Sequence, residues 1–189
     1  MALVSLKGRL AVATPALPDP NFDRTVVLLL AHSEEGAAGV VLNRPSEMHL
    51  SEPLPKWDRL AADPPVVFVG GPVGPGGAIC LAQSKPGLTS DQQAVGWTPL
   101  LDELGTLDLE QDPDDIGGGI EAIRVFAGYA GWGAGQLERE ISAGAWFVIP
   151  SQTNDAVSAQ PLGLWKQVLR REGGRLAIVA AFPPDPELN

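Results

Sequence analysis

Three glycines between two apolar runs are the residues of this sequence whose spacing most suggests ligand chemistry. The stretch VFAGYAGWGAGQLEREISAGAWFVIP, residues 125–150, predicts a strand, a glycine-rich loop, a short helix and a second strand. Nucleotide-binding folds hold phosphate with elements in this order, because glycine allows close backbone approach and a helix N-terminus attracts anions. Gly131, Gly133 and Gly135 are therefore candidate ligand-binding residues.

The details of this stretch also support a purely structural turn. Gln136 stands where the dinucleotide fingerprint has its third glycine, and the second strand ends in Pro150 without an acid to bind a ribose. With Gly135 as the N-cap, Glu138 falls at the third helical position, where its carboxylate can satisfy the helix amides itself. A structural turn and an anion or nucleotide site both remain open at this point.

Two aromatic residues accompany these glycines. Tyr129 and Trp132 lie where the backbone is bare, so that a flat side chain can face a ligand or a partner. We therefore expect the Gly131–Gly135 loop to lie at a surface cleft bordered by both rings. Valine at Gly133 should destabilise the protein if that residue needs a positive φ.

Other catalytic and metal-binding motifs are incomplete. GGPVGPGG, residues 70–77, lacks the lysine and the Ser or Thr of a phosphate loop, and we interpret it as a hairpin loop. The acidic run of residues 100–115 has proline where a calcium loop needs glycine, so it predicts a solvated surface segment. His32, His49 and Cys80 give no zinc spacing, and no G-x-S-x-G elbow occurs. The sequence thus predicts neither a cofactor nor a metal.

The elements that position these residues are mostly predicted strands. The runs TVVLLLAH, residues 25–32, and AGVVLN, residues 38–43, are apolar at nearly every position and predict a hairpin covered on both faces. VVFVG, residues 66–70, and AICLAQ, residues 78–83, predict a second pair, and the prolines between them exclude a regular element there. Cys80 is expected to be an inert, buried thiol.

Helices are predicted in two places. Residues 51–62 predict a short helix, and PLGLWKQVLRRE, residues 161–172, predicts an amphipathic helix that stops at Gly173. Residues 175–181 predict a final strand, and residues 182–189 a tail.

Length, composition and charge limit the class of protein. A chain of 189 residues with 44% hydrophobic residues predicts one domain over residues 1–189, with room for a small subdomain. Its formal net charge of −10 opposes binding to nucleic acid and to anionic membranes. Charged residues interrupt the apolar start, and no later run is long enough for a membrane span, so we expect a cytoplasmic protein.

Three blocks of the sequence together resemble the AlgH/YqgE family, and they occur in the family's order. The blocks are ATPALPDPNFDRTVVLLLAHSEEGAAGVVLNRP (13–45), VFVGGPV (67–73) and GYAGWGAGQLEREISAGAWFVIP (128–150). The resemblance implies a bacterial, cytosolic α+β protein with a mixed β-sheet in a partly barrel-like arrangement and helices packed outside. Members are commonly labelled transcriptional regulators, without an identified chemistry.

The family blocks also nominate positions that core packing would not choose. They are expected to bind a ligand or a partner, or else to fix loops by hydrogen bonds. The candidate residues are Asn21, Arg24, His32, Asn43, Arg44, Tyr129, Gly131, Trp132, Gly133 and Gln136.

Three hypotheses of function follow. The leading one is a non-enzymatic regulatory or ligand-binding protein that contacts an unknown small molecule or protein partner through its glycine-rich edge. The alternative is an enzyme acting on a small anionic metabolite, with Arg24 or Arg44 binding charge and His32 as acid or base, which requires these side chains to converge. Direct and specific DNA binding ranks last, because helix-turn-helix spacing and basic stripes are missing from the sequence.

Overall fold

The protein is described by a computed structural model over residues 4–17, 19–88, 92–116 and 118–183. Apolar, β-branched runs alternate with glycine and proline turns, so strands dominate. The strands are β1 (Arg9–Ala13), β2 (Val26–Ser33), β3 (Gly36–Val41), β4 (Pro45–His49), β5 (Val66–Val69), β6 (Val73–Ser84), β7 (Trp97–Leu101), β8 (Leu104–Leu107), β9 (Ile120–Gly133) and β10 (Trp146–Pro150). The α-helices are α1 (Gln136–Ser142), α2 (Thr153–Ala156), α3 (Leu164–Glu172) and α4 (Gly174–Val179).

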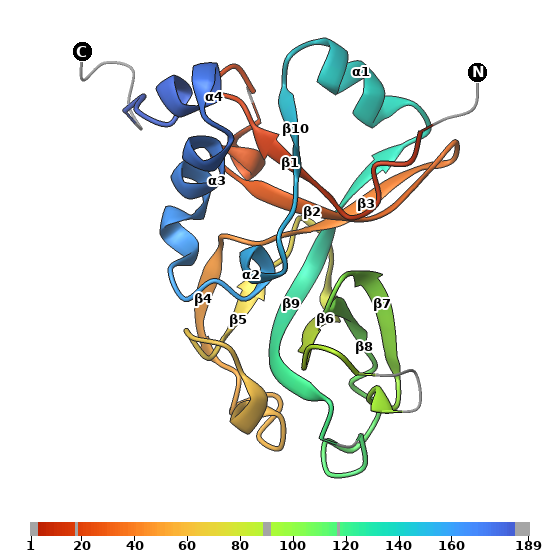
Figure 1. Ribbon diagram of the computed structural model, residues 1–189. Coiled ribbons are helices and arrows are strands. Elements are labelled where there is room, and N and C mark those ends of the chain that lie inside the picture. The colour runs from red at the N-terminus through yellow and green to blue at the C-terminus, as the bar shows by residue number, and fades with distance from the viewer. Residues whose placement is uncertain (1–3, 18, 89–91, 117, 184–189) are drawn as a thin grey trace.

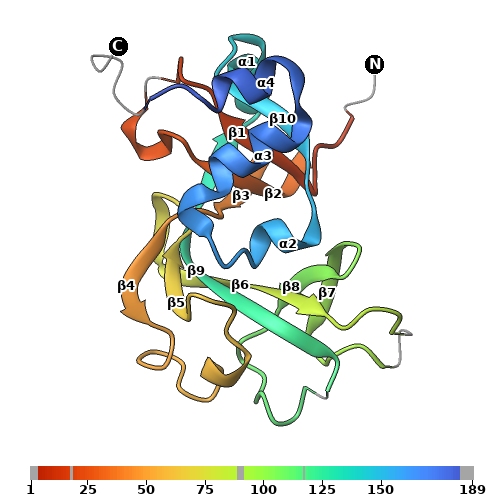
Figure 2. The ribbon, with the colours of Figure 1, turned by 60° about the vertical axis from the view of Figure 1, so that its left-hand side comes forward.

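The long strand β9 is the centre of the fold. Its first part pairs with β6 on one side and, in parallel, with β5 on the other, whereas its last residues pair with β3. The sheet order is β10-β1-β2-β3-β9-β6-β8-β7, and β4 joins through β5. The sheet curls where β9 passes from one half to the other, and the helices lie outside it (Figures 1 and 2). This is the α+β fold with a mixed, partly barrel-like sheet that the family resemblance implies.

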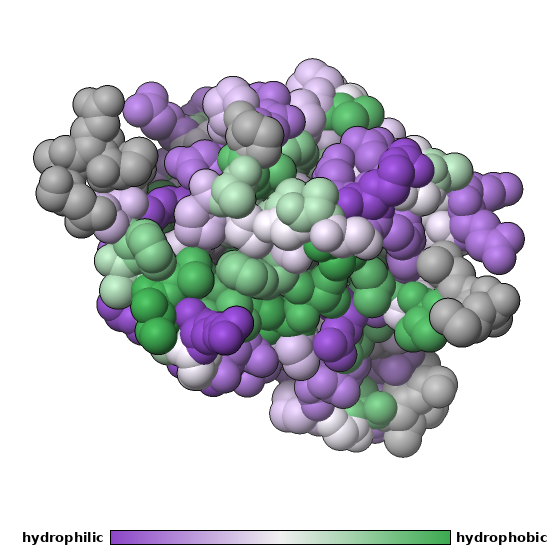
Figure 3. Space-filling view, turned by 90° about the horizontal axis from the view of Figure 1, so that it is seen from above, coloured by the Kyte–Doolittle hydropathy of each residue, from purple (hydrophilic) through white to green (hydrophobic). Residues whose placement is uncertain are grey.

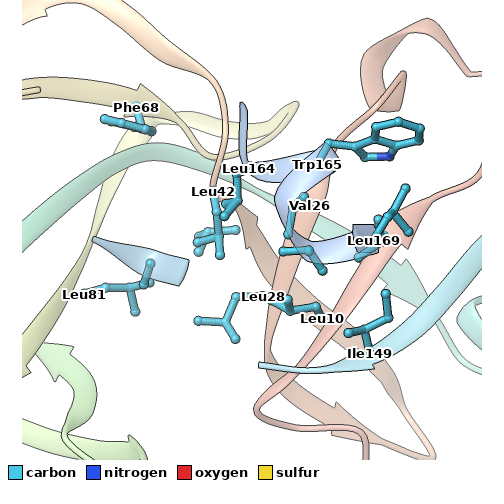
Figure 4. Packing of buried hydrophobic residues seen from close by; sticks show 14 of the residues in the cluster. Leu10, Val26, Leu28, Leu42, Phe68, Leu81, Ile149, Leu164, Trp165 and Leu169 are labelled. Carbon is cyan, nitrogen blue, oxygen red and sulfur yellow. The ribbon is translucent and has the colours of Figure 1, made fainter. Parts of the chain in front are cut away.

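Both faces of the β2–β3 hairpin are buried over Val26–Leu29 and Val40–Val41, as the apolar sequence there predicts, whereas the tip of the hairpin is partly exposed. Successive residues of a strand point to opposite faces. Val26 and Leu28 therefore join the core cluster that contains α3, and Val27 and Leu29 join the cluster that contains α1. All four are at most 1% exposed. Figure 4 shows Trp165 of α3 packed in the first cluster, close to Val26.

A buried arginine on β9 links the sheet to the segment between α2 and α3. The guanidinium of Arg124, on β9, donates hydrogen bonds to the backbone carbonyls of Ala156, Ser158 and Asp63. It also lies over the ring of Phe68, 4.3 Å from the ring centroid. Burial lowers the pKa of Arg124 to about 10. This charge is held by carbonyl oxygens and an aromatic face, so its role is structural.

The segment GGPVGPGG is not the hairpin loop that we expected. Strands β5 and β6 do not pair with each other, because β9 lies between them: Phe68 and Ile79 both pair with Phe126. Strand β6 begins at Val73 and includes Pro75, where the prolines predicted no regular element. Its pairing with β9 is interrupted after Val73. A proline is tolerated at such an interruption because no ladder hydrogen bond is needed there.

Two further elements differ from the expectation. Residues 175–181 do not form a strand; α4 occupies most of this segment, with Leu176 and Val179 packed on the core and Ile178 exposed. Short apolar runs do not distinguish a buried strand from a helix by periodicity alone. Residues 51–62 form turns and a 3-10 helix at Asp58–Leu60 instead of an α-helix.

The helix predicted over residues 161–172 is confirmed. A 3-10 turn at Pro161–Gly163 leads into α3, and Gly173 ends the helix with φ 74°. Of the predicted tail, residues 184–189 lie outside the described part of the chain.

The short helices leave some apolar surface uncovered. Figure 3 shows the molecule of Figure 1 from above, and on this face apolar side chains form a band between polar margins. The exposed large apolar residues of the described chain include Leu162, Ile178 and Phe182, near α3 and α4. No helix among the described residues is long and apolar enough to span a membrane.

Candidate functional site

Residues 125–150 form a strand, a short helix and a second strand, as predicted. The predicted glycine-rich loop between the first strand and the helix is not present. Gly131 and Gly133 belong to β9, where they pair with Ala38 and Gly36 of β3. Gly135 alone of the three lies at the turn, with φ 66°, as the N-cap of α1. Gly133 does not have the positive φ that was considered for it.

The start of α1 is occupied by the protein's own carboxylate. Glu138, at the third position of the helix, accepts a hydrogen bond from its own backbone N–H and contacts His32. These two interactions lower the pKa of Glu138 below its ordinary value. The sequence left a structural turn and an anion site open, and this geometry supports the structural turn.

Glu140 organises the other side of α1. One carboxylate oxygen accepts hydrogen bonds from the indole N–H groups of Trp132, at 2.9 Å, and Trp146, at 2.8 Å. The other accepts one from the Nε2 of Gln136, at 2.9 Å, and the Oε1 of Gln136 in turn accepts the N–H of Gly133, at 3.0 Å. Sequence analysis did not single out Glu140. The signal was present, because a buried tryptophan N–H needs an acceptor.

Trp132 is therefore a core residue and does not border an open cleft with its ring. It is 6% exposed and packs edge-on against Trp146, at a centroid distance of 5.7 Å, and beside Phe22. The expectation failed because odd and even residues of β9 face opposite sides of the sheet: Ala130 and Trp132 face α1, whereas Tyr129 and Gly131 face away from it.

His32 is a structural link between the N-terminal segment and α1. Its side chain is 1% exposed. Its Nδ1 accepts the backbone N–H of Leu6 at 2.9 Å, so its proton is on Nε2, which donates to Glu138 at 2.5 Å. Both ring nitrogens are engaged, and neither is free to exchange a proton with a substrate.

Arg24 and Asn43 fix the ends of neighbouring segments. The guanidinium of Arg24 donates to the carbonyls of Phe182, at 2.8 Å, and Pro183, and lies over the ring of Trp165. The amide of Asn43 accepts the N–H of Val26, at 2.9 Å, and donates to the carbonyl of Arg24, at 2.8 Å. Loop-fixing hydrogen bonds account for both residues.

Asn21 and Arg44 lie together in a small pocket of about 90 Å³, which Gly71 and Pro72 also line. Along the extended strand β2, His32 lies roughly 20 Å from Val26, the first residue of the strand, which follows Arg24 by two residues. The three residues of the enzyme hypothesis therefore do not converge: Arg24 binds the C-terminal carbonyls, Arg44 lines its own pocket, and His32 contacts α1.

A larger pocket, of about 440 Å³, opens on the face of β2, β3 and β9 that points away from α1. We name it the Tyr129 pocket. Six of its ten lining residues are glycine, alanine or serine. The lining residues are Ala31, Ser33, Glu35, Gly36, Ala37, Ala38, Val73, Tyr129, Gly131 and Trp132.

The floor of the Tyr129 pocket consists of residues with little or no side chain, and Gly36 and Gly131 are two of them. A Cβ atom at Gly36 would lie 2.2 Å from the carbonyl oxygen of Trp132, so glycine is required there. At Gly131, by contrast, a Cβ atom would meet the ring of Tyr129 at 3.4 Å, an ordinary contact. The floor at Gly131 is open because of the residue type and not because the backbone demands it.

The chemistry available in the Tyr129 pocket is limited. Among its lining residues Glu35 carries the one ionisable carboxylate, and the polar groups beside it are the hydroxyls of Ser33 and Tyr129. Within the described ranges, no three His, Cys, Asp or Glu side chains are grouped as a metal site requires. The arrangement can bind a ligand by contact and stacking, but it presents no acid–base pair.

Comparison with known proteins identifies the family. The AlgH-like family model matches residues 10–177. A UPF0301 protein of Streptomyces coelicolor is 50% identical to this chain, with 98% of this chain and 96% of the relative covered. A UPF0301 protein of Thermobifida fusca is 48% identical, with 100% and 98% covered.

Two solved structures share the fold over nearly the full length. A crystal structure of a Corynebacterium diphtheriae protein superimposes with a TM-score of 0.87 at 28% identity, covering 96% of this chain and 95% of that one. The solution structure of the AlgH protein from Pseudomonas aeruginosa gives a TM-score of 0.68 at 33% identity, covering 97% and 98%. The chain therefore belongs to the AlgH-like family, whose biochemical function is not established.

Proposed function

We propose that this protein is a non-enzymatic ligand-binding protein and that the Tyr129 pocket is its binding site. The observation that carries the proposal is a half-buried Tyr129 ring beside an open floor of small residues, with no acid–base pair in reach. Ligand pockets typically enclose ~300–1,000 Å³ and combine apolar contact with few polar groups. The Tyr129 pocket, at about 440 Å³, is within that range.

The chemistry of the pocket favours a planar, largely apolar ligand. A flat floor formed by Ala31, Ala38 and Gly131 accepts a ring laid against the sheet, with the edge or face of Tyr129 as its neighbour. The hydroxyls of Ser33 and Tyr129 and the carboxylate of Glu35 supply a small number of orienting groups. Three of the polar residues that the family motifs nominated, His32, Arg24 and Asn43, do not line this pocket. They form structural hydrogen bonds elsewhere.

A protein-observed NMR screen of planar aromatic compounds tests the proposal, with indole, quinoline and adenosine as the first probes. Binding should shift the backbone amides of Ser33 and Gly131. Gly131→Val fills the floor and should abolish the shift. Gly133→Val is the matched control, because it is the same substitution on the same strand at a residue that does not line the pocket.

The NMR screen can support or contradict the proposed binding site. Hits that perturb Ser33 in the wild type and in Gly133→Val, but not in Gly131→Val, support the site. If every bound compound perturbs residues elsewhere, or if Gly131→Val binds as the wild type does, the proposal is wrong. Thermal melting of each variant without ligand checks that the fold is intact.

A further inference from the structure

Within the described part of the chain, Arg171 and Arg44 each line a pocket, and they differ in whether a carboxylate neutralises their charge. Arg171 lines a pocket of about 450 Å³ and is paired with the carboxylate of Asp155 through two hydrogen bonds, at 2.8 and 3.0 Å. Arg44 lines the pocket of about 90 Å³ and makes one long hydrogen bond, 3.3 Å, to the backbone carbonyl of Asp23. Among the described residues, no carboxylate forms an ion pair with Arg44.

Asn21 and Gly71 offer hydrogen-bond donors beside Arg44, and the remaining lining residues are apolar. No described residue accepts a hydrogen bond from the side-chain amide of Asn21 or from the backbone N–H of Gly71, and both residues line the pocket. Val41, Val69 and Pro72 complete it. Apolar side chains beside a guanidinium lower the local dielectric constant and so strengthen its attraction to an anion.

The backbone of this pocket is fixed before any ligand arrives. The carbonyl of Arg44 accepts the N–H of Val69 at 2.8 Å, and the neighbouring carbonyl of Gly70 accepts the N–H of Val41 at 2.8 Å. Gly71 lies so close to β9 that a Cβ atom would be 2.2 Å from the carbonyl oxygen of Tyr129. A preorganised site loses less conformational entropy on binding.

We propose that the Arg44 pocket binds a compact oxyanion, a phosphate or a carboxylate group, with the guanidinium of Arg44 as the cationic partner and Asn21 and Gly71 as further donors. A guanidinium presents a planar fork of N–H groups that matches the oxygens of both anions. The pocket is far smaller than the ~300 Å³ of an ordinary ligand pocket, so it accommodates a free ion or the anionic end of a larger molecule.

This site is distinct from the Tyr129 pocket. The two pockets share no lining residue. The anion site goes beyond the proposed function, and either one can fail without the other.

Nearby acids do not occupy the position of the anion. Asp19 is committed to the N–H of Asn21 through its side chain, at 2.9 Å. Asp23 offers Arg44 its backbone carbonyl, not its carboxylate. The net charge of −10 opposes diffuse anion binding, so a saturable response to an anion must come from a local cationic site.

An NMR titration of the full chain tests the proposal at constant ionic strength. Sodium phosphate and sodium acetate are the probes, and sodium chloride is the reference. We expect phosphate, acetate or both to shift the Gly71 amide and the Arg44 Nε–H saturably. Arg44→Gln should weaken the affinity by about tenfold or more, since a hydrogen bond to a charged group is lost. Arg9→Gln, an exposed arginine on β1, is the matched control and should leave the affinity unchanged.

A second variant keeps the test independent of any effect of Arg44 on folding. Val69 is 45% exposed, so Val69→Glu adds a competing carboxylate at the pocket without removing a core side chain. It should abolish the response to the anion. Preference for phosphate or for acetate identifies the group that the pocket takes. Equal shifts with chloride, or unchanged affinity in Arg44→Gln or in Val69→Glu, would overturn the proposal.

Discussion

Replacement of Glu140 by alanine should be among the most destabilising single changes on α1. The substitution removes three hydrogen bonds and leaves the buried indole N–H groups of Trp132 and Trp146 without an acceptor. Each unsatisfied buried donor costs about 1–3 kcal/mol, so the free energy of unfolding should fall by about 2–6 kcal/mol. In a chain of this size the melting temperature should fall by roughly 4–24 °C.

Glu140→Gln should cost less, about 1–2 kcal/mol, because its oxygen still accepts from both indoles while its NH₂ faces the NH₂ of Gln136. Urea unfolding followed by tryptophan fluorescence and near-UV circular dichroism measures both variants. Glu121→Ala, at an exposed position of β9, is the control and should stay within about 0.5 kcal/mol of the wild type. The reasoning is refuted if Glu140→Ala is as stable as the control, or no less stable than Glu140→Gln.

Three further predictions concern single residues. Cys80 is 2% exposed and burial raises its pKa to about 12, so the native protein should not react with Ellman's reagent at pH 8 until it is unfolded; rapid native labelling would contradict this. The folded pKa of Glu138 is depressed by its own N–H and by His32, so its stabilising contribution is present above the unfolded value of about 4.3 and is lost as the pH falls below it. The difference in melting temperature between the wild type and Glu138→Gln should therefore shrink below about pH 4.3, and a constant difference would argue against this linkage. Gly39→Ala should be strongly destabilising, because its Cβ would lie 2.5 Å from the carbonyl oxygen of Leu28, whereas Gly133→Ala meets no atom closer than 3.8 Å; similar melting temperatures for the two variants would contradict the packing argument.

The local pattern of apolar and polar residues correctly predicted those elements whose buried faces can be recognised from their own sequence. The hairpin at residues 25–43 is apolar at Val26–Leu30 and Val40–Leu42 and is buried on both faces over most of those residues, and the helix at residues 161–172 has a proline start, an apolar stripe and a glycine stop. The segment at residues 175–181 was misjudged because its apolar run suits either a strand or a helix. The helix is favoured by packing of Leu176 and Val179 against the core, a tertiary effect that a local pattern does not contain.

The candidate site was predicted in part, for a similar reason. Family motifs pointed to the region that contains the Tyr129 pocket, but strand alternation divides its residues between two faces, so that Trp132 enters the core while Gly131 lines a pocket. The face on which each residue lies depends on strand β9 continuing through Gly133. Repeated glycines more often mark turns than strands, so the sequence did not predict this continuation. Binding by the candidate residues stays a prediction, to be settled by the NMR titrations.

The central position of β9 also determines when the chain can fold during its own synthesis. Gly39 of β3 pairs with Ala130, so the ribosome must add roughly 90 residues before the edge of β3 finds its partner, which takes roughly 5–18 seconds at ~5–20 residues per second. Strand β1 waits longer still for β10, since Arg9 pairs with Pro150. During that interval the apolar β2–β3 hairpin has been synthesised but its neighbouring strands have not, so the nascent chain exposes an aggregation-prone segment.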